Sequence, residues 1–236
     1  MSAAEKEKHN HGGHRNRMRT RYRREGIDHF AEHEVLELLL YYCYPQRNTN
    51  DIAHKMLEAF GSLHHLFEAD VETLMERLGC TENIAVLLNL VPALANRYFQ
   101  SKWSKKVTFN NAKTAGAYAI DLFVGLTAER FYLISVDARN RLNSAVLISE
   151  GTTDEAAVYP REVAKAALDS KASAIILAHN HPGGTLKPSR GDLEVTRQLV
   201  NWLQVINIPI LDHIIVAGDT YYSFAERRQH VAGWER

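Results

Sequence analysis

Hydrophobic positions in the first half of the chain recur with the spacing of helices. Apolar residues return every three or four positions in the segments 33–42, 50–61, 71–79 and 82–99. This spacing places the apolar side chains of each segment on one face of a helix. We therefore expect a small all-α module, which we bound at residues 25–104.

Polar residues and glycines mark the expected ends of these helices. Asp51, Ser62 and Asp70 stand where helices begin, and their side-chain oxygens can accept hydrogen bonds from backbone amides that lack a partner within the helix. Gly61 and Gly79 stand where helices end, in a position that favours the left-handed backbone. These signals agree with the hydrophobic spacing and predict short helices joined by tight turns.

Beyond the polar stretch around Trp103, the pattern changes to that of strands. Segments 130–137 and 141–149 flank a short turn and are typical of a β-hairpin. Further strands are expected at 173–177, 208–218 and 220–224, and helices at 111–125, 160–170 and 192–207. Strands interleaved with helices predict an α+β domain over residues 105–236, in which helices flank a mixed β-sheet.

Charge sets the first residues apart from the rest of the chain. The formal net charge is zero, but residues 1–24 carry eight Lys and Arg against two Glu, and residues 25–104 carry five against twelve acidic residues. The first segment is therefore at +6 and the second at −7. We expect residues 1–24 to be a basic flexible arm. Such an arm is either a solvated leader or a segment that makes weak contacts with nucleic-acid phosphates.

Composition excludes several classes of protein. The chain is 45% hydrophobic, which is enough for a real core, but it has no apolar stretch of membrane-spanning length and no apolar leader near its start. We therefore expect a cytoplasmic protein without a membrane partner. Cys43 and Cys80 are isolated in sequence, which argues against a disulfide framework and a cysteine-based zinc site.

The most informative stretch is AHNHPGGTLKPSRGDL, residues 178–193, which follows the expected strand 173–177. Side chains alternate across a strand, so His179 and His181 point to the same side. Two imidazoles at this spacing can reach one small cation. The strand end is therefore a candidate metal site.

A third ligand follows after a reversal of the chain. Pro182 and two glycines turn the backbone, and a helix that begins at Ser189 carries Asp192 in its first turn. Taken alone, Ser189-x-x-Asp192 is also a helix-capping signature. If the helix packs back over the strand end, however, Asp192 completes the site. Two imidazoles and a carboxylate suit Zn²⁺ and leave a fourth position for water.

A hydrolytic zinc site also needs a base that takes the proton of the attacking water. Four glutamates stand near ends of expected strands or helices: Glu129, Glu150, Glu155 and Glu162. The periodicity of the sequence does not choose among them.

The motif resembles that of a known family. His179-x-His181-Pro182 followed by Ser189-x-x-Asp192 resembles the JAMM signature of the JAB/MPN metalloprotease superfamily. HNHPGG and PSRGD resemble the bacterial RadC branch in particular. The resemblance continues through YPREV before the motif and LDHIIVAGDTYYSF after it, and the helical module resembles the helix-hairpin-helix region of that branch.

This resemblance implies a cytidine-deaminase-like α+β fold and one Zn²⁺ per chain. It implies that His179, His181 and Asp192 bind the metal. In this superfamily a glutamate that opens an early strand acts as general base and then acid, and AERFYLISVD matches that position at Glu129. Ser189 would help to stabilise the oxyanion. The implied activity is hydrolysis of a peptide or isopeptide bond in a peptide or protein substrate.

Two departures from the family pattern matter. Gly183 replaces a serine that often follows His-Pro, which leaves every expected ligand in place. The module reads LGCTEN where a G-I-G-like turn would hold a DNA phosphate, and Glu82 adds a negative charge there. This argues against duplex binding through the module.

Two further hypotheses compete with a peptidase. The name of the RadC branch is associated with DNA repair, so the zinc fold would then be a non-catalytic scaffold of a DNA-associated repair or recombination factor. Alternatively, the same ligands would recognise a peptide tail without turnover. Asp212 and His213, on the following strand, have either a structural role or a supporting role beside the metal ligands.

Overall fold

The structure is a computed structural model that describes residues 3–103, 107–151 and 158–234, with side chains from residue 13 onward. It divides into two compact units, with the boundary between Val91 and Pro92. In the described ranges no helix combines the length and the apolar content that crossing a bilayer requires.

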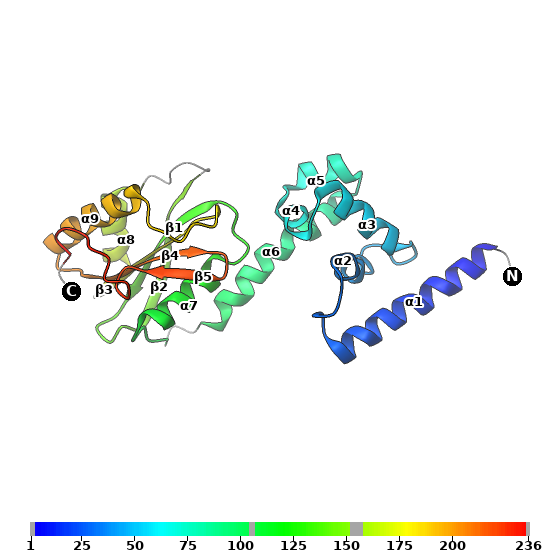
Figure 1. Cartoon of the computed structure of the whole chain (residues 1–236), viewed down its shortest axis with the longest axis horizontal. Helices are drawn as coiled ribbons and strands as arrows, with labels where there is room; N and C mark the ends of the chain where they lie inside the picture. The colour runs from blue at the N-terminus through cyan, green and yellow to red at the C-terminus, as the bar shows by residue number, and fades with distance from the viewer. Residues whose placement is uncertain (1–2, 104–106, 152–157, 235–236) are drawn as a thin grey trace. The chain divides into compact units, whose positions relative to one another are not determined.

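The first unit contains the expected run of helices (Figure 1). They are α2 (Glu32–Leu40), α3 (Thr49–Phe60), α4 (Leu63–Glu68), α5 (Val71–Leu78) and the first part of α6 (Glu82–Lys102). Their apolar faces meet in one core, in which Leu36, Leu40, Leu66, Leu74 and Leu88 are fully buried. The spacing of apolar residues thus predicts this unit correctly.

The expected caps are present with one exception. The side chains of Ser62 and Asp70 accept hydrogen bonds from backbone amides of α4 and α5, and Gly61 and Gly79 adopt the left-handed backbone at helix ends. The prediction for Asp51 was wrong, since Asn48 is the N-cap of α3. Asp51 lies in the first turn instead, where it accepts a hydrogen bond from the Asn48 side chain.

Residues expected to form a flexible arm are helical in the structure. Helix α1 spans Ala3–Glu25, and its Met18 is buried. Arg15 donates hydrogen bonds to the carbonyl oxygens of Tyr44, Pro45 and Arg47 at 2.5–2.7 Å. These carbonyls lie about 30 residues away in sequence, so a pattern read along the arm does not reveal them.

The boundary between the units falls inside α6, earlier than the position near residue 104 that the composition suggests. The second half of α6 belongs with the following helix, α7 (Ala112–Phe123). Asn96 of α6 donates to the carbonyl oxygens of Leu122 and Val124, both at 2.9 Å. Trp103 donates to Asp121. These contacts tie the end of α6 to the C-terminal unit.

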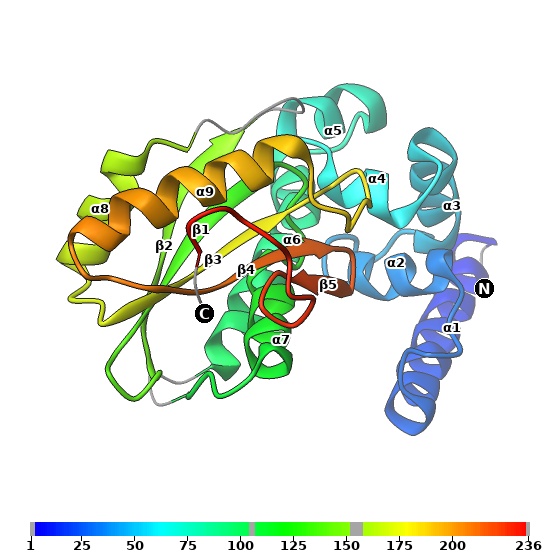
Figure 2. The ribbon, with the colours of Figure 1, turned by 60° about the vertical axis from the view of Figure 1, so that its left-hand side comes forward.

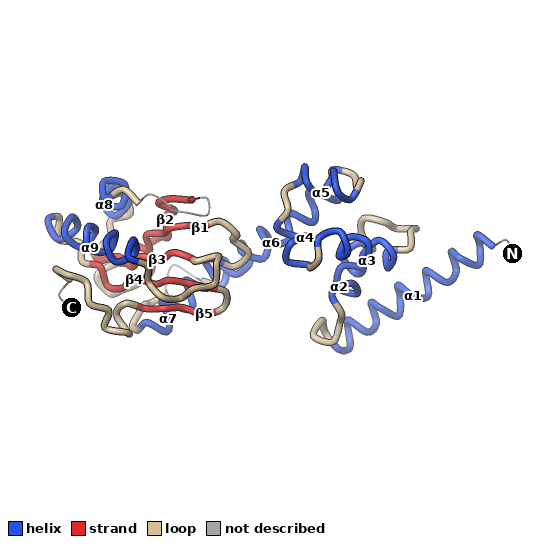
Figure 3. The backbone as a smooth tube through the Cα atoms, turned by 45° about the horizontal axis from the view of Figure 1, so that its top comes forward, coloured by secondary structure: helices blue, strands red, loops and turns tan. Residues whose placement is uncertain are grey.

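The C-terminal unit is built on one five-stranded mixed sheet. Its strands are β1 (Glu129–Val136), β2 (Leu142–Gly151), β3 (Ala174–Asn180), β4 (Ile210–Ala217) and β5 (Thr220–Ser223). They lie in the order β2-β1-β3-β4-β5, which Figure 3 shows in red. Strands β1 and β2 form the expected hairpin, and only β3 and β4 pair in parallel.

Helices cover both faces of this sheet (Figure 2). Helix α7 packs on one face around Ile134, Ile176 and Ile214. Helices α8 (Pro160–Asp169) and α9 (Arg190–Val205) pack on the other face around Leu133 and Leu177. The central strand β3 is buried along its whole length, which explains its unbroken apolar sequence. The α+β class and the mixed sheet with flanking helices are confirmed.

Close packing of α7 on β5 predicts that the effect of Gly116→Ala on stability depends on the residue at position 221. A Cβ atom on Gly116 would lie 2.6 Å from ring atoms of Tyr221. We expect Gly116→Ala to lower the free energy of unfolding by about 1–3 kcal/mol, because the ring must move. In a Tyr221→Ala background the same change should be neutral, or stabilising by up to about 1 kcal/mol from helix propensity.

Urea unfolding followed by tryptophan fluorescence measures this effect, because Trp103, Trp202 and Trp234 all lie in the C-terminal unit. An equal effect of Gly116→Ala in both backgrounds would contradict the steric explanation.

Candidate metal centre

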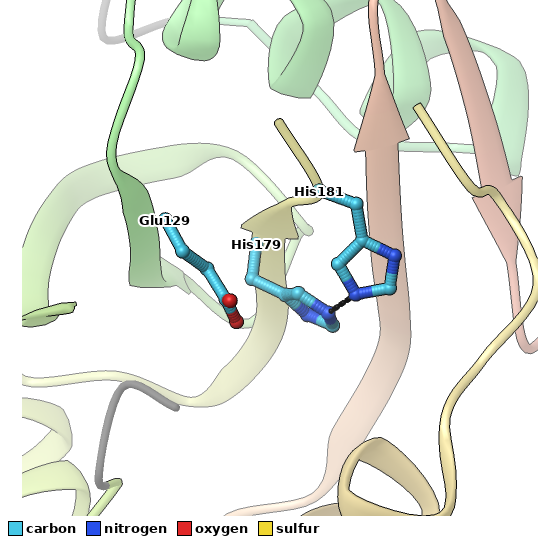
Figure 4. A group of neighbouring side chains, drawn as sticks. All are labelled: Glu129, His179 and His181. Atoms are coloured by element: carbon cyan, nitrogen blue, oxygen red, sulfur yellow. Dashed lines mark hydrogen bonds between the residues drawn. The ribbon is translucent and has the colours of Figure 1, made fainter. Parts of the chain in front are cut away.

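His179, His181 and Asp192 meet at one end of the central strand. His179 is the penultimate residue of β3, and His181 follows the strand directly. Their Nε2 atoms lie 2.9 Å apart (Figure 4). One Asp192 carboxylate oxygen lies 3.0 Å from Nε2 of His179, and the other lies 3.5 Å from Nε2 of His181. The chain reversal between strand and helix thus brings the three sequence-predicted ligands together.

A capping box at the start of α9 orients Asp192. Ser189 is the N-cap, and its hydroxyl accepts a hydrogen bond from the Asp192 amide at 3.1 Å. In return the Ser189 amide donates to one carboxylate oxygen of Asp192 at 2.6 Å. Asp192 is therefore both a member of the capping box and a candidate ligand. Ser189 itself is exposed.

Glu129, the first residue of β1, joins the two histidines. Each of the three side chains offers an atom within 4.8 Å of the other two, and the Glu129 carboxylate points toward the His179 ring in Figure 4. Asp192 is not in this mutually close group, although it contacts both histidines. Glu129 thus faces the imidazole pair.

The other candidate bases lie elsewhere, or outside the described residues. Glu150 pairs with Arg130 at 2.9 Å, and Glu162 pairs with Arg161 on α8 at 3.4 Å. Glu155 lies outside the residues that the structure describes. Among the described candidates, Glu129 is the glutamate that geometry places beside the histidines.

Asn180 holds the backbone around Glu129 in place. Its side-chain amide donates to the carbonyl oxygen of Ala128 at 3.0 Å and accepts from the amide of Arg130 at 2.8 Å. These backbone groups flank Glu129 on either side. Asn180 is buried, and no motif in the sequence predicted this role.

A cavity of about 550 Å³ opens beside the site. Glu129 and His181 line it together with Ala128, Gly151 and Gly183. The two glycines have no side chain to narrow the space. An extended segment of another molecule can therefore approach both Glu129 and His181 from this side.

Asp192 and His181 shift each other's pKa. Burial alone would raise the pKa of Asp192, but hydrogen bonds with His179 and His181 lower it far below its usual value. The pKa of His181 is raised, chiefly by its hydrogen bond with Asp192. Asp192 is therefore a carboxylate at neutral pH, as a metal ligand must be.

Two further buried residues, His213 of β4 and Thr196 of α9, extend the site inward. Nδ1 of His179 lies 2.9 Å from Nε2 of His213, and Nδ1 of His213 lies 2.6 Å from the Thr196 hydroxyl. Complete burial, followed by the charge of His179, lowers the pKa of His213 well below its ordinary value. His213 is therefore a neutral ring in contact with a candidate ligand.

Asp212 has a structural role instead. Its carboxylate accepts hydrogen bonds from the Ser223 hydroxyl at 2.5 Å and from the Ala225 amide at 2.9 Å. These bonds hold the chain after β5 against β4. Asp212 and His213 are neighbours in sequence, but alternate strand positions give them different surroundings.

Comparison with known proteins shows the family of this chain. Residues 109–229 match the family model described as the RadC-like JAB domain. This chain belongs to the RadC family. It is 34% identical to UPF0758 protein FN0909 of Fusobacterium nucleatum over 91% of this chain and 95% of that protein. It is 37% identical to UPF0758 protein PSHAa2643 of Pseudoalteromonas translucida over 86% of this chain and 91% of that protein. Neither name states an activity.

The donor atoms of this RadC-family protein fit a metal cation. Nδ1 of His181 lies 2.6 Å from the carbonyl oxygen of Thr185. A carbonyl only accepts hydrogen bonds, so Nδ1 carries a proton, and when the ring is neutral its Nε2 presents a lone pair. That lone pair faces Nε2 of His179 at 2.9 Å and the Asp192 carboxylate. Such electron-rich atoms repel one another unless they share a cation or protons.

The bridging amide of Asn180 predicts the effect of its removal. Asn180→Ala leaves the Ala128 carbonyl and the Arg130 amide without this partner, so the free energy of unfolding of the C-terminal unit should fall by about 1–3 kcal/mol. Asn110→Ala, at an exposed position, should change it by less than about 0.5 kcal/mol. Urea unfolding measured by tryptophan fluorescence compares the two variants. Equal effects would contradict the role given to Asn180.

Proposed function

We propose that this RadC-family protein is a zinc-dependent metallopeptidase that hydrolyses a peptide or isopeptide bond. One observation carries the proposal: the two Nε2 atoms lie 2.9 Å apart, with the Asp192 carboxylate in contact with both rings and Glu129 beside them. Two imidazoles and one carboxylate are a ligand set that catalytic zinc uses, with a position left open for water.

Zinc, when bound, acidifies water and polarises the substrate carbonyl. Glu129 removes one proton from the attacking water as its oxygen bonds to the carbonyl carbon. Glu129 then delivers this proton to the leaving nitrogen as the carbon–nitrogen bond breaks. The products are a carboxylic acid and an amine. The cavity beside Glu129 supports this assignment, because the substrate needs access to the base.

Ser189 supplies a donor at the rim of the site. Its oxygen accepts the amide of Asp192, which leaves its own hydroxyl proton free to donate. We assign this proton to the substrate oxygen on which negative charge develops. The capping bond fixes the Ser189 side chain before substrate arrives, so little reorganisation is needed.

Metal content and cleavage test the proposal separately. We expect purified protein to hold about one zinc per chain, and His179→Ala to lose it, as measured by elemental mass spectrometry. Glu129→Gln should keep the zinc but lower cleavage of a peptide library by about 10² to 10⁴-fold, because a neutral amide cannot accept the proton. Glu162→Gln, the same change on α8, should leave both quantities unchanged.

The outcomes separate the hypotheses. Zinc binding without cleavage of any peptide would support recognition of a peptide tail instead of turnover. Full cleavage by Glu129→Gln would overturn the base assignment. Cleavage by the zinc-free His179→Ala variant would show that the activity came from a contaminant.

A second candidate function is weak nucleic-acid association through α1. Arg15, Arg21 and Arg24 are engaged by carbonyl or carboxylate groups of the chain itself. In contrast, Arg17, Arg19 and Arg23 are exposed and form no ion pair among the side chains that the structure describes. Three exposed cations on one helix favour a contact with phosphates.

Charge removal tests this second function. The triple variant Arg17→Gln, Arg19→Gln, Arg23→Gln should bind duplex DNA more weakly and reduce the slope of log K against log salt by about 2 to 3. Fluorescence anisotropy at two salt concentrations measures both effects. A matched triple change of exposed cations in the C-terminal unit, Lys113→Gln, Arg139→Gln, Lys165→Gln, should have little effect. Absence of DNA binding by the unaltered protein at low salt would exclude this function.

A further inference from the structure

We propose that His213 and Thr196 are positioning residues that hold the proton of His179 on Nδ1, so that Nε2 presents its lone pair to the metal. This inference rests on the proposed zinc function. It assigns a role to two buried polar groups that the hydrolytic scheme does not otherwise use. Both residues are completely inaccessible to solvent.

The direction of the hydrogen bonds follows from the Asp192 backbone. The Thr196 hydroxyl lies 2.5 Å from the carbonyl oxygen of Asp192, which can only accept. The single hydroxyl proton of Thr196 is therefore used in this bond. Nδ1 of His213 lies 2.6 Å from the same hydroxyl oxygen, so His213 must be the donor there. His213 consequently carries its proton on Nδ1.

The next bond transmits this choice to the metal ligand. With that proton on Nδ1, the neutral ring of His213 has a lone pair on Nε2, which accepts from the ring that faces it. The facing atom is Nδ1 of His179, at 2.9 Å. His179 therefore keeps its proton on Nδ1, and its Nε2 is directed at His181 and Asp192. This is the protonation pattern that zinc binding through Nε2 requires.

Aromatic packing prevents the rings from turning out of this arrangement. The Phe131 ring stacks on His179 with an interplanar angle of 11°, and the Phe224 ring stacks on His213 with an angle of 26°. His179 is only 1% exposed. Because the rings are buried and stacked, water cannot easily replace a missing partner.

The two candidate metal ligands His179 and His181 are thus oriented by different groups. A backbone carbonyl orients His181, and no side-chain substitution removes that group directly. A chain of two side chains orients His179, and this chain starts at the backbone of Asp192. Asp192 therefore offers its carboxylate to the site and also sets the proton of the opposite ligand.

Substitution of Thr196 tests the inference in the full-length protein. Thr196→Val keeps the shape but removes the acceptor, so His213 Nδ1 loses its partner and the proton on His179 is no longer directed. We expect zinc affinity, measured by competition with a chromophoric chelator, to fall about 10 to 100-fold. Thr196→Ser keeps the hydroxyl but loses a buried methyl group, and it should bind zinc within a few-fold of the original protein. A purely packing role of Thr196 predicts the reverse order.

The proton positions are a second readout that does not depend on activity. Long-range ¹H–¹⁵N correlation spectra distinguish protonated from bare ring nitrogens. We expect His213 to carry its proton on Nδ1 in the zinc-free and the zinc-loaded protein, and to lose this preference in Thr196→Val. Unchanged spectra and unchanged zinc affinity in Thr196→Val would overturn the inference while the zinc function stands. Failure of the unaltered protein to bind zinc would overturn the proposed function instead.

If Thr196→Val does not fold, variants of His213 provide the same test. His213→Gln can place an amide oxygen near the former Nε2 position and accept from His179. His213→Leu cannot accept a hydrogen bond. We expect the zinc affinity of the Gln variant to exceed that of the Leu variant by a factor of about 10 or more. Equal affinities of the two variants would contradict a positioning role for His213.

Discussion

The meeting of the strand end with the start of α9 is the constraint on which the site depends. His179 lies in a strand that is buried along its whole length, and His181 follows it with its amide bonded to the Val216 carbonyl of β4, so the sheet sets the positions of both. Asp192 stands in the first turn of a helix that packs on that sheet. Its carboxylate reaches both imidazoles only because the chain reverses tightly between them. The capping box then ties the carboxylate to the helix start.

Capping and metal binding are therefore compatible uses of one side chain. One carboxylate oxygen of Asp192 accepts the Ser189 amide, and the other lies 3.0 Å from Nε2 of His179. Helix N-termini also stabilise negative charge, which supports the ionised form of Asp192. A feature that looks like an ordinary helix start in sequence thus holds a carboxylate, a candidate ligand, at the end of the sheet. The helix-capping signature and the candidate metal site therefore require the same position of Asp192.

The sequence predicts what depends on local pattern. The spacing of apolar residues predicts α2, α3, α5 to α9 and the hairpin, and Ser62 marks the start of α4. The motif predicts that His179, His181 and Asp192 come together. Choosing Glu129 over the other glutamates required a family resemblance, because the approach of β1 to β3 is a long-range pairing. The contacts of helix α1 were missed for a similar reason, since Arg15 finds its partners about 30 residues away.

The supporting groups were the least predictable part of the site. A histidine in the apolar strand 208–218 has the sequence signature of an ordinary core residue, and Thr196 is one of several polar residues on an amphipathic helix. His213 lies 34 residues from His179 in sequence and 17 from Thr196, so the three come together only through the pairing of β3 with β4 and the packing of α9 on β4. A ligand can be recognised by its spacing, whereas a group that orients a ligand is recognised by what it contacts. In the buried chain from Asp192 to His179, each polar group forms a hydrogen bond with the next. Polar groups are kept in a protein core only when their hydrogen bonds are formed in this way.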